Sequence, residues 1–419
     1  MTYYKSYVLW AVASLFYLYQ FVLRLSPSVM MEDLMEAFTI DATGFAALGS
    51  IALLSYSLFQ IPLGAFADRF GVRKCILVFL TVCIVGTFIF ATAPNLWIAQ
   101  FGRFMIGMGS AAAFLSVGKI INQCFPEEKR ATLFGLTMAV GTVGALNGGL
   151  PLCYLLELVG WSHCLLMLCL LGLVLLTVSY FTLSLPESHE RHERVSSFKS
   201  LTLILKNKEC WTYALTAIGL YLAICVFGDL WGVAYIMKAY GIERAQAVPI
   251  ISMMYVGLCV GSITITWISD RLGKARSFII FSTIMLLILL SLVIAPLSLP
   301  FEMLYLLFFL IGFFAGAEML CFSGACKAVS SSIAGITTGF LNGLVMIVGA
   351  GIQMGVGIVL DALWKGSTGF DGIKIYDVND YRIALSLTLP ILLLALFSSL
   401  FIKEKKSLTL NLNLKETLI

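Results

Sequence analysis

The stretch Gly64-Ala-Phe-Ala-Asp68-Arg69-Phe-Gly71-Val-Arg73-Lys74 is a polar, basic turn, and a shortened copy returns 202 residues later as Asp270-Arg271-Leu-Gly273-Lys274-Ala-Arg276. At the same offset, Met-Glu-Ala-Phe-Thr-Ile-Asp at 35–41 aligns without a gap with Met-Lys-Ala-Tyr-Gly-Ile-Glu at 237–243. Two matches in one register indicate that the chain is internally duplicated.

The composition predicts a membrane protein. Of the 419 residues, 60% are hydrophobic and only 12% are charged, and the mean hydropathy is +0.97, whereas soluble domains carry about 25% charged residues. Backbone groups in lipid must pair internally, so only helices or a closed barrel can span a bilayer. The apolar runs are long and continuous and do not alternate as barrel strands do, so we predict helices.

We predict an all-α membrane protein with twelve transmembrane helices, six on each side of a polar linker. The predicted spans are 7–31, 43–67, 75–93, 96–121, 131–156, 163–185, 210–236, 246–268, 277–297, 303–326, 334–361 and 383–402. The corresponding organisation is an N-terminal six-helix bundle at 1–185, a linker at 186–208, a C-terminal six-helix bundle at 209–402 and a tail at 403–419.

The basic residues predict the orientation. On the side of the linker we count 19 Lys and Arg, on the other side five, and three lie within helices. Because short cytoplasmic loops retain positive charge, we expect both termini and the linker to be cytoplasmic. The net charge of +4 therefore reflects topology, and binding of nucleic acid, which needs a clustered soluble basic face, is not expected.

These features resemble the major facilitator superfamily, in which the loop between helices 2 and 3 reads Gly-x-x-x-Asp-x-x-Gly-x-Arg-Lys/Arg. Residues 64–74 match every position, and the second copy keeps Asp270, Gly273 and Arg276. Arg103-Phe-Met-Ile-Gly-Met-Gly in helix 4 and the glycine-rich segment 141–151 in helix 5 are similar to further family motifs. The resemblance implies two pseudo-symmetric six-helix bundles of parallel orientation.

The resemblance also implies a conformational latch on the cytoplasmic face. Glycines at 64 and 71 allow close helix approach and a tight turn, and Asp68 can accept hydrogen bonds from a helix start or from Arg73. The alternative is that the basic residues only anchor the loop on the positive side. The predicted latch residues are Gly64, Asp68, Gly71, Arg73, Lys74, Asp270 and Arg276.

Arg24 is the first candidate for binding a substrate. Tyr17, Gln20 and Arg24 are three and four residues apart and share one face of the first helix. A guanidinium gives a carboxylate or phosphate two parallel hydrogen bonds, so Arg24 is expected to bind an anionic group of the solute. The alternative is structural pairing with an acid or with carbonyl groups freed near Pro27.

Asp229 lies at the position in helix 7 that corresponds to residue 27, within one turn of the counterpart of Arg24. The two charges are expected either to pair directly, which closes the outer side, or to share a zwitterionic solute; alternatively, Asp229 lies near the outer surface. Asn147, Asn342, Gln353 and Tyr255 are polar groups within helices, where hydrogen bonding in a cavity competes with interhelical bonding. Of these we include Tyr255 and Asn342 among the substrate-binding residues.

Glu318 and Arg103 are the candidates for proton coupling. Glu318 lies about 22 Å into helix 10, where no aqueous surface accounts for a carboxylate, and such a group can take up and release a proton. The alternative is a salt bridge to helix 4 or 11. Arg103 matches the helix 4 arginine of the family, which implies proton transfer or structural pairing.

We therefore expect a secondary active transporter that moves a small polar organic solute, an amino acid or a related metabolite, by alternating access and proton-coupled import. Residues 16–30 are similar to those of a subgroup of bacterial family members from intracellular pathogens, which imports amino acids or nucleosides. This resemblance implies a place in the bacterial inner membrane. The alternatives are an exporter of drugs or siderophore-like compounds by proton antiport, a facilitative uniporter, and a sensor. No phosphate-binding loop and no catalytic constellation is present, so we expect no enzyme, cofactor or metal site. The expected partners are the solute, the proton and the lipid bilayer, and the expected form is a monomer.

Overall fold

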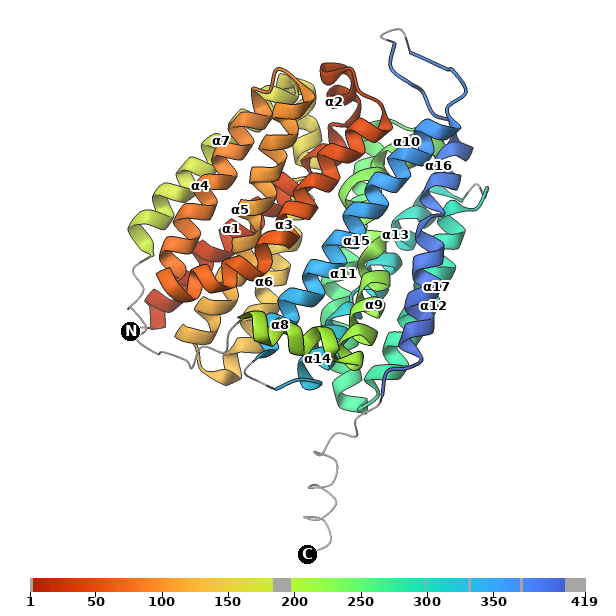
Figure 1. Ribbon diagram of the computed structural model, residues 1–419. Helices are drawn as coiled ribbons and strands as arrows, with labels where there is room; N and C mark the ends of the chain where they lie inside the picture. The colour runs from red at the N-terminus through yellow and green to blue at the C-terminus, as the bar shows by residue number, and fades with distance from the viewer. Residues whose placement is uncertain (1–2, 184–196, 298, 331–332, 370–371, 404–419) are drawn as a thin grey trace, which may run out of the picture.

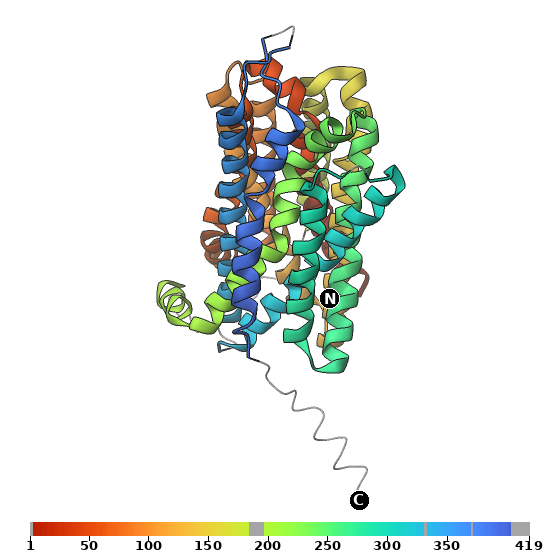
Figure 2. The ribbon, with the colours of Figure 1, turned by 90° about the vertical axis from the view of Figure 1, so that its right-hand side faces the viewer.

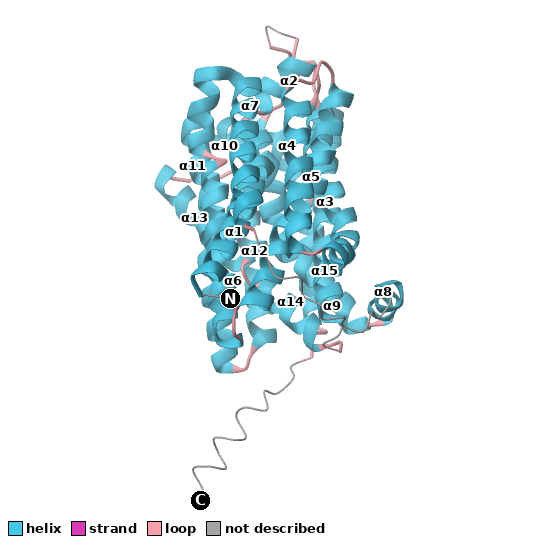
Figure 3. Ribbon diagram, turned by 90° about the vertical axis from the view of Figure 1, so that its left-hand side faces the viewer, coloured by secondary structure: helices cyan, strands magenta, loops and turns pink. Residues whose placement is uncertain are grey.

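The computed structural model describes residues 3–183, 197–297, 299–330, 333–369 and 372–403, which are almost entirely helical (Figure 3). Eleven helical stretches of the described residues are long and apolar enough to cross a membrane. The helices of the first half are α1 Tyr3–Val29, α2 Met31–Phe38, α3 Ala42–Phe70, α4 Val72–Ala91, α5 Leu96–Cys124, α6 Glu127–Asn147 and α7 Leu150–Thr182. Those of the second half are α8 Ser197–Lys206, α9 Lys208–Ala223, the π-helix η1 Ile224–Trp231, α10 Gly232–Tyr240, α11 Arg244–Leu272, α12 Ala275–Ile294, α13 Phe301–Ala315, α14 Glu318–Lys327, α15 Ala334–Leu363, α16 Val378–Leu385 and α17 Thr388–Ser399.

These elements make the twelve predicted spans. One apolar stretch of 55 residues contains α6 and α7 and turns back on itself at Gly160, whose φ of 77° suits glycine. The residues of α7 before Gly160 continue the direction of α6, and those after it form the sixth span. Helices 7, 10 and 12 are each built from consecutive elements: α9, η1 and α10; α13 and α14; α16 and α17. The prediction of an all-α membrane protein with twelve spanning helices is therefore confirmed.

Figure 1 shows the spans running between two ends of one bundle, with α1–α7 on one side and α9–α17 on the other. We call the end that carries Gly71, Gly273 and α8 the basic end, and the end that carries α2 and residues 364–369 and 372–377 the opposite end. Because each half crosses the membrane six times, both halves begin and finish at the basic end.

Repeat-related helices pack in the same way in the two halves. A Cβ atom on Gly107 of α5 would collide with the carbonyl oxygen of Ala52 on α3, and one on Gly312 of α13 would collide with that of Met254 on α11. Residues 52 and 254 are separated by the 202 positions of the sequence repeat. Glycine at these contacts lets the helix backbones touch, as small residues commonly do in membrane bundles.

The halves meet mainly along α3 and α15, and also where α1 contacts η1 and where α6 contacts α11. The hydroxyl group of Ser57 on α3 donates to the carbonyl oxygen of Gly343 on α15 at 2.8 Å. The neighbouring pair, Tyr56 and Asn342, is joined by a hydrogen bond of 3.5 Å. The interface thus carries polar contacts in the middle of the bundle, where they are costly to leave unpaired.

The predicted linker contains a helix, α8, that was not predicted from the sequence. Residues 184–196 lie outside the described part, but α8 follows within the linker and projects sideways from the bundle at the basic end (Figure 2). Leu201 and Ile204 pack against the second half, whereas Leu203 and Leu205 are exposed. Such alternation suits a helix that lies in a membrane interface. The domain boundaries remain a prediction, and residues 404–419 of the predicted tail also lie outside the described part.

Candidate functional site

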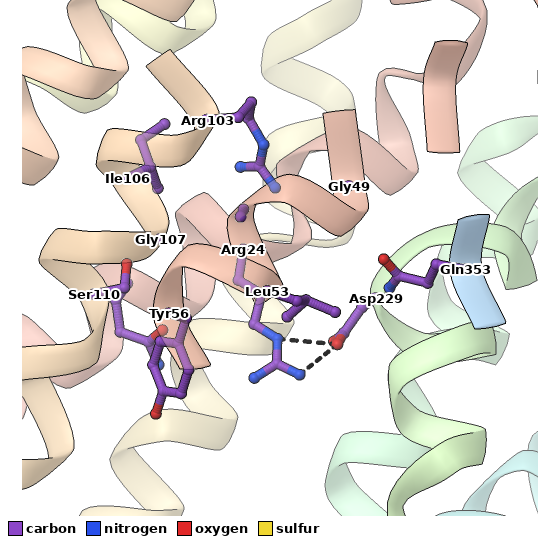
Figure 4. A pocket seen from close by; sticks show the side chains of 12 residues that line it. Arg24, Gly49, Leu53, Tyr56, Arg103, Ile106, Gly107, Ser110, Asp229 and Gln353 are labelled. Atoms are coloured by element: carbon purple, nitrogen blue, oxygen red, sulfur yellow. Dashed lines mark hydrogen bonds and ion pairs between the residues drawn. The ribbon is translucent and has the colours of Figure 1, made fainter. Parts of the chain in front are cut away.

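Arg24 of α1 and Asp229 of η1 form an ion pair between the two halves (Figure 4). Nε and Nη2 of Arg24 both donate to Oδ2 of Asp229, at 2.9 and 2.5 Å. The exposed fractions of the two side chains are 11% and 3%, so the pair is almost entirely removed from solvent. Of the two arrangements expected from the sequence, direct pairing is the one that this structure contains, and Asp229 does not lie at the outer surface.

Polar and aromatic side chains surround the pair. The hydroxyl group of Tyr255 on α11 donates to Oδ1 of Asp229 at 2.7 Å, so both carboxylate oxygens accept hydrogen bonds. The Arg24 guanidinium lies 5.9 Å from the ring centre of Phe21 and 5.8 Å from that of Tyr221. A desolvated cation is stabilised by such ring faces. Nη2 also approaches Sγ of Cys225 at 3.9 Å, whereas Nη1 donates to no described residue.

The helices on both sides of the pair are irregular. Asp229 lies in a π-helical segment whose eight residues are all buried, and π-helical turns occur often at functional sites. On α1, Pro27 has no N–H, so the carbonyl group of Leu23 lacks its usual helical donor. The two irregular segments occupy repeat-related positions, 27 and 229.

Arg103 of α5 and Ser26 of α1 replace the donor that Pro27 removes, since the hydroxyl group of Ser26 donates to the carbonyl oxygen of Leu23 at 3.0 Å. Arg103 also binds this oxygen. Its Nη1 donates to the carbonyl oxygen of Leu23 at 3.0 Å, and its Nε donates to that of Leu48 on α3 at 3.0 Å. The side chain is 2% exposed and therefore ties α1, α3 and α5 together inside the first half. Pairing with freed carbonyl groups, which the sequence reading considered for Arg24, is thus found at Arg103. A role for Arg103 in proton coupling stays a prediction.

A small cavity lies beside the ion pair. Its volume is about 20 Å³, which is room for a water molecule but not for an organic solute. Figure 4 shows side chains of both halves reaching toward it. The lining residues are Gln20, Arg24, Gly49, Ala52, Leu53, Tyr56, Arg103, Ile106, Gly107, Ser110, Asp229 and Gln353.

The other predicted binding residues are only partly gathered at this cavity. Gln20 lines it, whereas Tyr17 lies behind it, with its hydroxyl group 3.8 Å from Sδ of Met138 on α6. Asn342 contacts the lining residue Tyr56 and lies eleven positions before Gln353 along α15, about 16 Å closer to the basic end. Tyr56 and Tyr221 were not predicted from the sequence. The only signal for them is that each is a polar residue within a predicted transmembrane helix.

Glu318 is buried at the start of α14, just after the break between α13 and α14 at residues 316–317. Its side chain is 3% exposed and makes no hydrogen bond or ion pair with any residue in the described ranges. The salt bridge that the sequence reading considered as an alternative is therefore absent from the described part of the chain. The titratable groups that interact with it electrostatically are Arg24, Tyr17, Tyr221, Cys225 and Cys321.

A second cluster joins the halves at the opposite end and was not predicted. Oδ2 of Asp361, near the end of α15, accepts hydrogen bonds from the amide group of Thr43 at 2.8 Å and from its hydroxyl group at 2.5 Å. Oδ1 accepts from Tyr376 at 2.6 Å and from Lys374 at 2.9 Å, and Lys374 also binds Asp41 at 3.0 Å. A carboxylate at the N-terminus of α3 is favoured by the helix dipole. We call Asp41, Thr43, Asp361, Lys374 and Tyr376 the end clamp.

The pKa values of the two loop residues of the end clamp, Lys374 and Tyr376, are both raised. The hydrogen bond to Asp361 raises the pKa of Lys374 above its ordinary value. Burial, and then the hydrogen bond to Asp361, raises the pKa of Tyr376. Next to the clamp, Arg244 at the start of α11 binds Glu32 and Asp33 of α2, each at 2.9 Å. The opposite end is therefore held closed by charged groups from both halves.

The two basic turns make matching contacts inside their own halves. Nη2 of Arg73 donates to the carbonyl oxygen of Tyr180 at the end of α7 at 3.0 Å, and that of Arg276 donates to Leu400 after α17 at 2.8 Å. Gly71 and Gly273 have positive φ values of 82° and 63° at the turns.

The remaining latch residues make fewer contacts. Gly64 accepts a 3.5 Å bond from Lys119, Lys74 and Asp270 are exposed, and the Asp68 side chain lies outside the described part. The latch stays a prediction. Among the described residues, no group of three or more His, Cys, Asp or Glu is arranged to hold a metal ion.

The sequence model of the Major Facilitator Superfamily matches residues 9–354. The chain belongs to this family. The membership confirms the resemblance found in the sequence and the expectation that the chain is not an enzyme.

Similar proteins include an uncharacterized transporter, YybO, of Bacillus subtilis, which is 28% identical over 41% of this chain and 39% of its own length. The sialic acid transporter NanX of Escherichia coli is 21% identical over 56% of this chain and 57% of its own length. A gentisate transporter of Corynebacterium glutamicum is 22% identical over 75% and 72%. The matched segments thus span less than two thirds of the first two relatives.

Solved structures show the same fold. A bacterial homolog of the human lysosomal transporter Spinster superposes with a TM-score of 0.73 at 16% identity, covering 97% of this chain and all of that chain. A mutant of the nucleoside transporter NupG gives a TM-score of 0.73 at 15% identity and covers 95% and 99%.

Proposed function

We propose that this protein is a proton-coupled importer of a small organic solute that carries a carboxylate, such as an organic acid or an amino acid. The observation that carries the proposal is the buried Arg24–Asp229 pair, which lies where the two halves meet and lines a cavity. In alternating access the solute binds between the halves. An ion pair with one residue in each half is therefore a place where solute binding can change the contact between the halves.

Arg24 has donors left for a solute. Nε and Nη2 are both directed to one oxygen of Asp229, and no described residue accepts a bond from Nη1. A carboxylate can therefore bind through Nη1 and Nη2 in the bidentate geometry that guanidinium groups favour, replacing the weak contact of Nη2 with Sγ of Cys225. The cavity is too small for a solute in this conformation, so binding requires the halves to part at the basic end, away from the end clamp.

The charges at the site support coupling to protons. When no solute is present, the positive charges of Arg24 and Arg103 are balanced if Asp229 and Glu318 are both ionised. A bound carboxylate adds one negative charge to this desolvated region, and protonation of Glu318 restores the balance. Because uncompensated charge is costly inside a membrane protein, solute and proton favour one another's binding.

The names of the relatives point to the same class of solute. The related proteins include transporters of sialic acid, gentisate, hexuronate and 4-hydroxybenzoate. An amino acid, which the sequence reading favoured, also carries a carboxylate and stays within the proposal. We further propose that the basic end is cytoplasmic, because basic residues gather at that end. We also propose a bacterial inner membrane, because the related transporters reported above are bacterial.

The proposal is tested by a ligand panel followed by uptake. Purified full-length protein is heated with sialic acid, glucuronate, gentisate, 4-hydroxybenzoate, L-alanine, uridine and tetraphenylphosphonium, and its melting temperature is measured. We expect at least one carboxylate to stabilise the wild type, and uptake of that acid into proteoliposomes to be driven by an inward proton gradient. Stabilisation by the organic cation alone would overturn the proposal in favour of the exporter. Uptake at the same rate with and without the proton gradient would indicate a uniporter.

A further inference from the structure

Gln353 of α15 has an amide oxygen that the protein itself does not use. Its Nε2 donates to the carbonyl oxygen of Cys225 at 2.7 Å. Its Oε1 is buried and accepts no hydrogen bond from any residue in the described part of the chain. The side chain is 1% exposed, so bulk water does not satisfy this oxygen.

The orientation of this amide follows from its partner. A backbone carbonyl can only accept a hydrogen bond, so the nitrogen of the amide must face Cys225 and the oxygen must face away. The backbone of Gln353 is also held in place, because the indole N–H of Trp231 donates to its carbonyl oxygen at 3.1 Å. Leaving a buried acceptor unpaired normally costs free energy, so its placement calls for a donor.

The unused oxygen lies beside the proposed carboxylate site. Gln353 and Arg24 both line the cavity, and Figure 4 shows the amide group reaching from α15 toward the Arg24–Asp229 pair. Both side chains contact the same residue, since Nη2 of Arg24 approaches Sγ of Cys225 at 3.9 Å while Nε2 of Gln353 binds its carbonyl group. Gln353 and Arg24 thus line one cavity and have Cys225 as a common neighbour.

Gly49 of α3 brings the backbone of the first half close to the Gln353 amide. A Cβ atom at residue 49 would lie 3.3 Å from Oε1 of Gln353 and 2.8 Å from both methyl groups of Leu230. A larger residue would therefore press on the amide oxygen and on its neighbour. The absence of a side chain at 49 lets the backbone of α3 lie against Leu230 and Oε1 of Gln353 without a clash.

We infer that Oε1 of Gln353 accepts a hydrogen bond from an ammonium or hydroxyl group of the solute whose carboxylate binds Arg24. This inference rests on the proposed function and narrows it. The solute is then an acid with a donor group close to its carboxylate, an amino acid or a hydroxy acid, and not a plain carboxylic acid. A site with an unpaired acceptor discriminates strongly against an analogue without the donor.

The test compares matched acids on the full-length protein. The first series is L-alanine, L-lactate and propionate, which differ only in an ammonium, a hydroxyl or a hydrogen at the second carbon; the second is 2-hydroxybenzoate and benzoate, and the third is glucuronate and cyclohexanecarboxylate. Dissociation constants are measured by titration calorimetry. We expect the donor-bearing member of at least one series to bind roughly tenfold or more tightly than its donor-free analogue.

Two variants separate a solute contact from a structural role. Gln353→Leu removes the acceptor together with the bond to Cys225, whereas Gly49→Ala crowds Oε1 and leaves that bond in place. Both are expected to abolish most of the preference for the donor-bearing acid, and Gly351→Ala, whose Cβ would meet nothing within 4 Å, is expected to keep it. If Gln353→Leu does not fold, Gly49→Ala and the wild-type series decide.

Each outcome has a distinct meaning. Equal binding of acids with and without the donor, or an unchanged preference in the variants, overturns this inference while the carboxylate site stands. Binding of none of these acids to the wild type overturns both the inference and the proposed function.

Discussion

Arg24 and Asp229 meet through a single carboxylate oxygen, because both Nε and Nη2 of the arginine donate to Oδ2. The second oxygen accepts a hydrogen bond from Tyr255, so both oxygens of the carboxylate are bonded. Nη1 of Arg24, by contrast, donates to no residue in the described part of the chain. This asymmetry suits a pair that holds the halves together and still receives an anion. Asp229 fixes the position of Arg24, and a solute can bind without first displacing it.

Arg24→Lys and Arg24→Gln test the guanidinium. Lysine keeps the charge but loses the bidentate geometry, so we expect uptake efficiency to fall by roughly ten- to a hundredfold. Glutamine leaves Asp229 buried without its cation, which typically costs about 3–5 kcal/mol, and is expected to lower the melting temperature as well. Arg271→Gln, at the exposed end of α11, is the matched control and should retain uptake. Wild-type uptake by Arg24→Lys would argue against a bidentate contact.

Glu318→Gln tests proton coupling. The wild type is expected to take up the identified acid faster as the outside pH falls from 8 to 6, since Glu318 must be protonated when the solute binds. Glutamine mimics the protonated form, so the variant should exchange solute across the membrane without a pH dependence and without accumulating it. Glu302→Gln, an exposed carboxylate at the start of α13, should behave like the wild type. A pH dependence that survives in Glu318→Gln would place the coupling site elsewhere.

Asp361→Asn tests the end clamp. The substitution removes the charge that binds the start of α3, Lys374 and Tyr376, so we expect a loss of about 1–3 kcal/mol and a melting temperature lower by several degrees. Thermal unfolding of the purified variant measures this change. Glu302→Gln again provides a carboxylate-to-amide control. An unchanged melting temperature would mean that the clamp contributes little to this conformation.

The pH dependence of the clamp follows from Lys374. Its pKa is raised above 10.5 by the hydrogen bond to Asp361, so the stabilisation is fully present below the unfolded value and is lost only as the pH rises through the higher folded value. We therefore expect the difference in melting temperature between the wild type and Lys374→Met to be constant from pH 7 to 9. It should shrink only above about pH 10.5. A difference that already vanishes near pH 8 would contradict this assignment.

The sequence predicted the fold well because the determining signals are local. Apolar runs of sufficient length define the spans, and Gly160 ends one of them where two helices meet without a polar loop. The π-helix around Asp229 was not predictable, since no local signal in Ile224–Trp231 marks a wider winding. Its hydrogen bonds with Gln353 and Tyr255 come from other helices.

The site residues were predictable within the transmembrane spans, where charged residues are rare. They were not predictable at helix ends and in loops, where charged residues are common. Arg24, Asp229, Arg103 and Glu318 stood out because ionisable groups inside a bilayer are costly. Asp361 and Lys374 lie near the predicted end of a helix and in a loop, where charged residues are ordinary, so only their meeting with Thr43 in space reveals the end clamp.

The central claim, that Arg24 binds the solute and does not merely pair with Asp229, is tested most directly by exchanging the two charges. Uptake of the identified acid and the melting temperature are measured for Arg24→Asp, Asp229→Arg and the double variant. We predict that the double variant recovers much of the stability that each single variant loses, but takes up no acid above background, because the guanidinium then stands on the wrong half of the site. Recovery of wild-type uptake together with stability would contradict the claim and would reduce the pair to a structural contact.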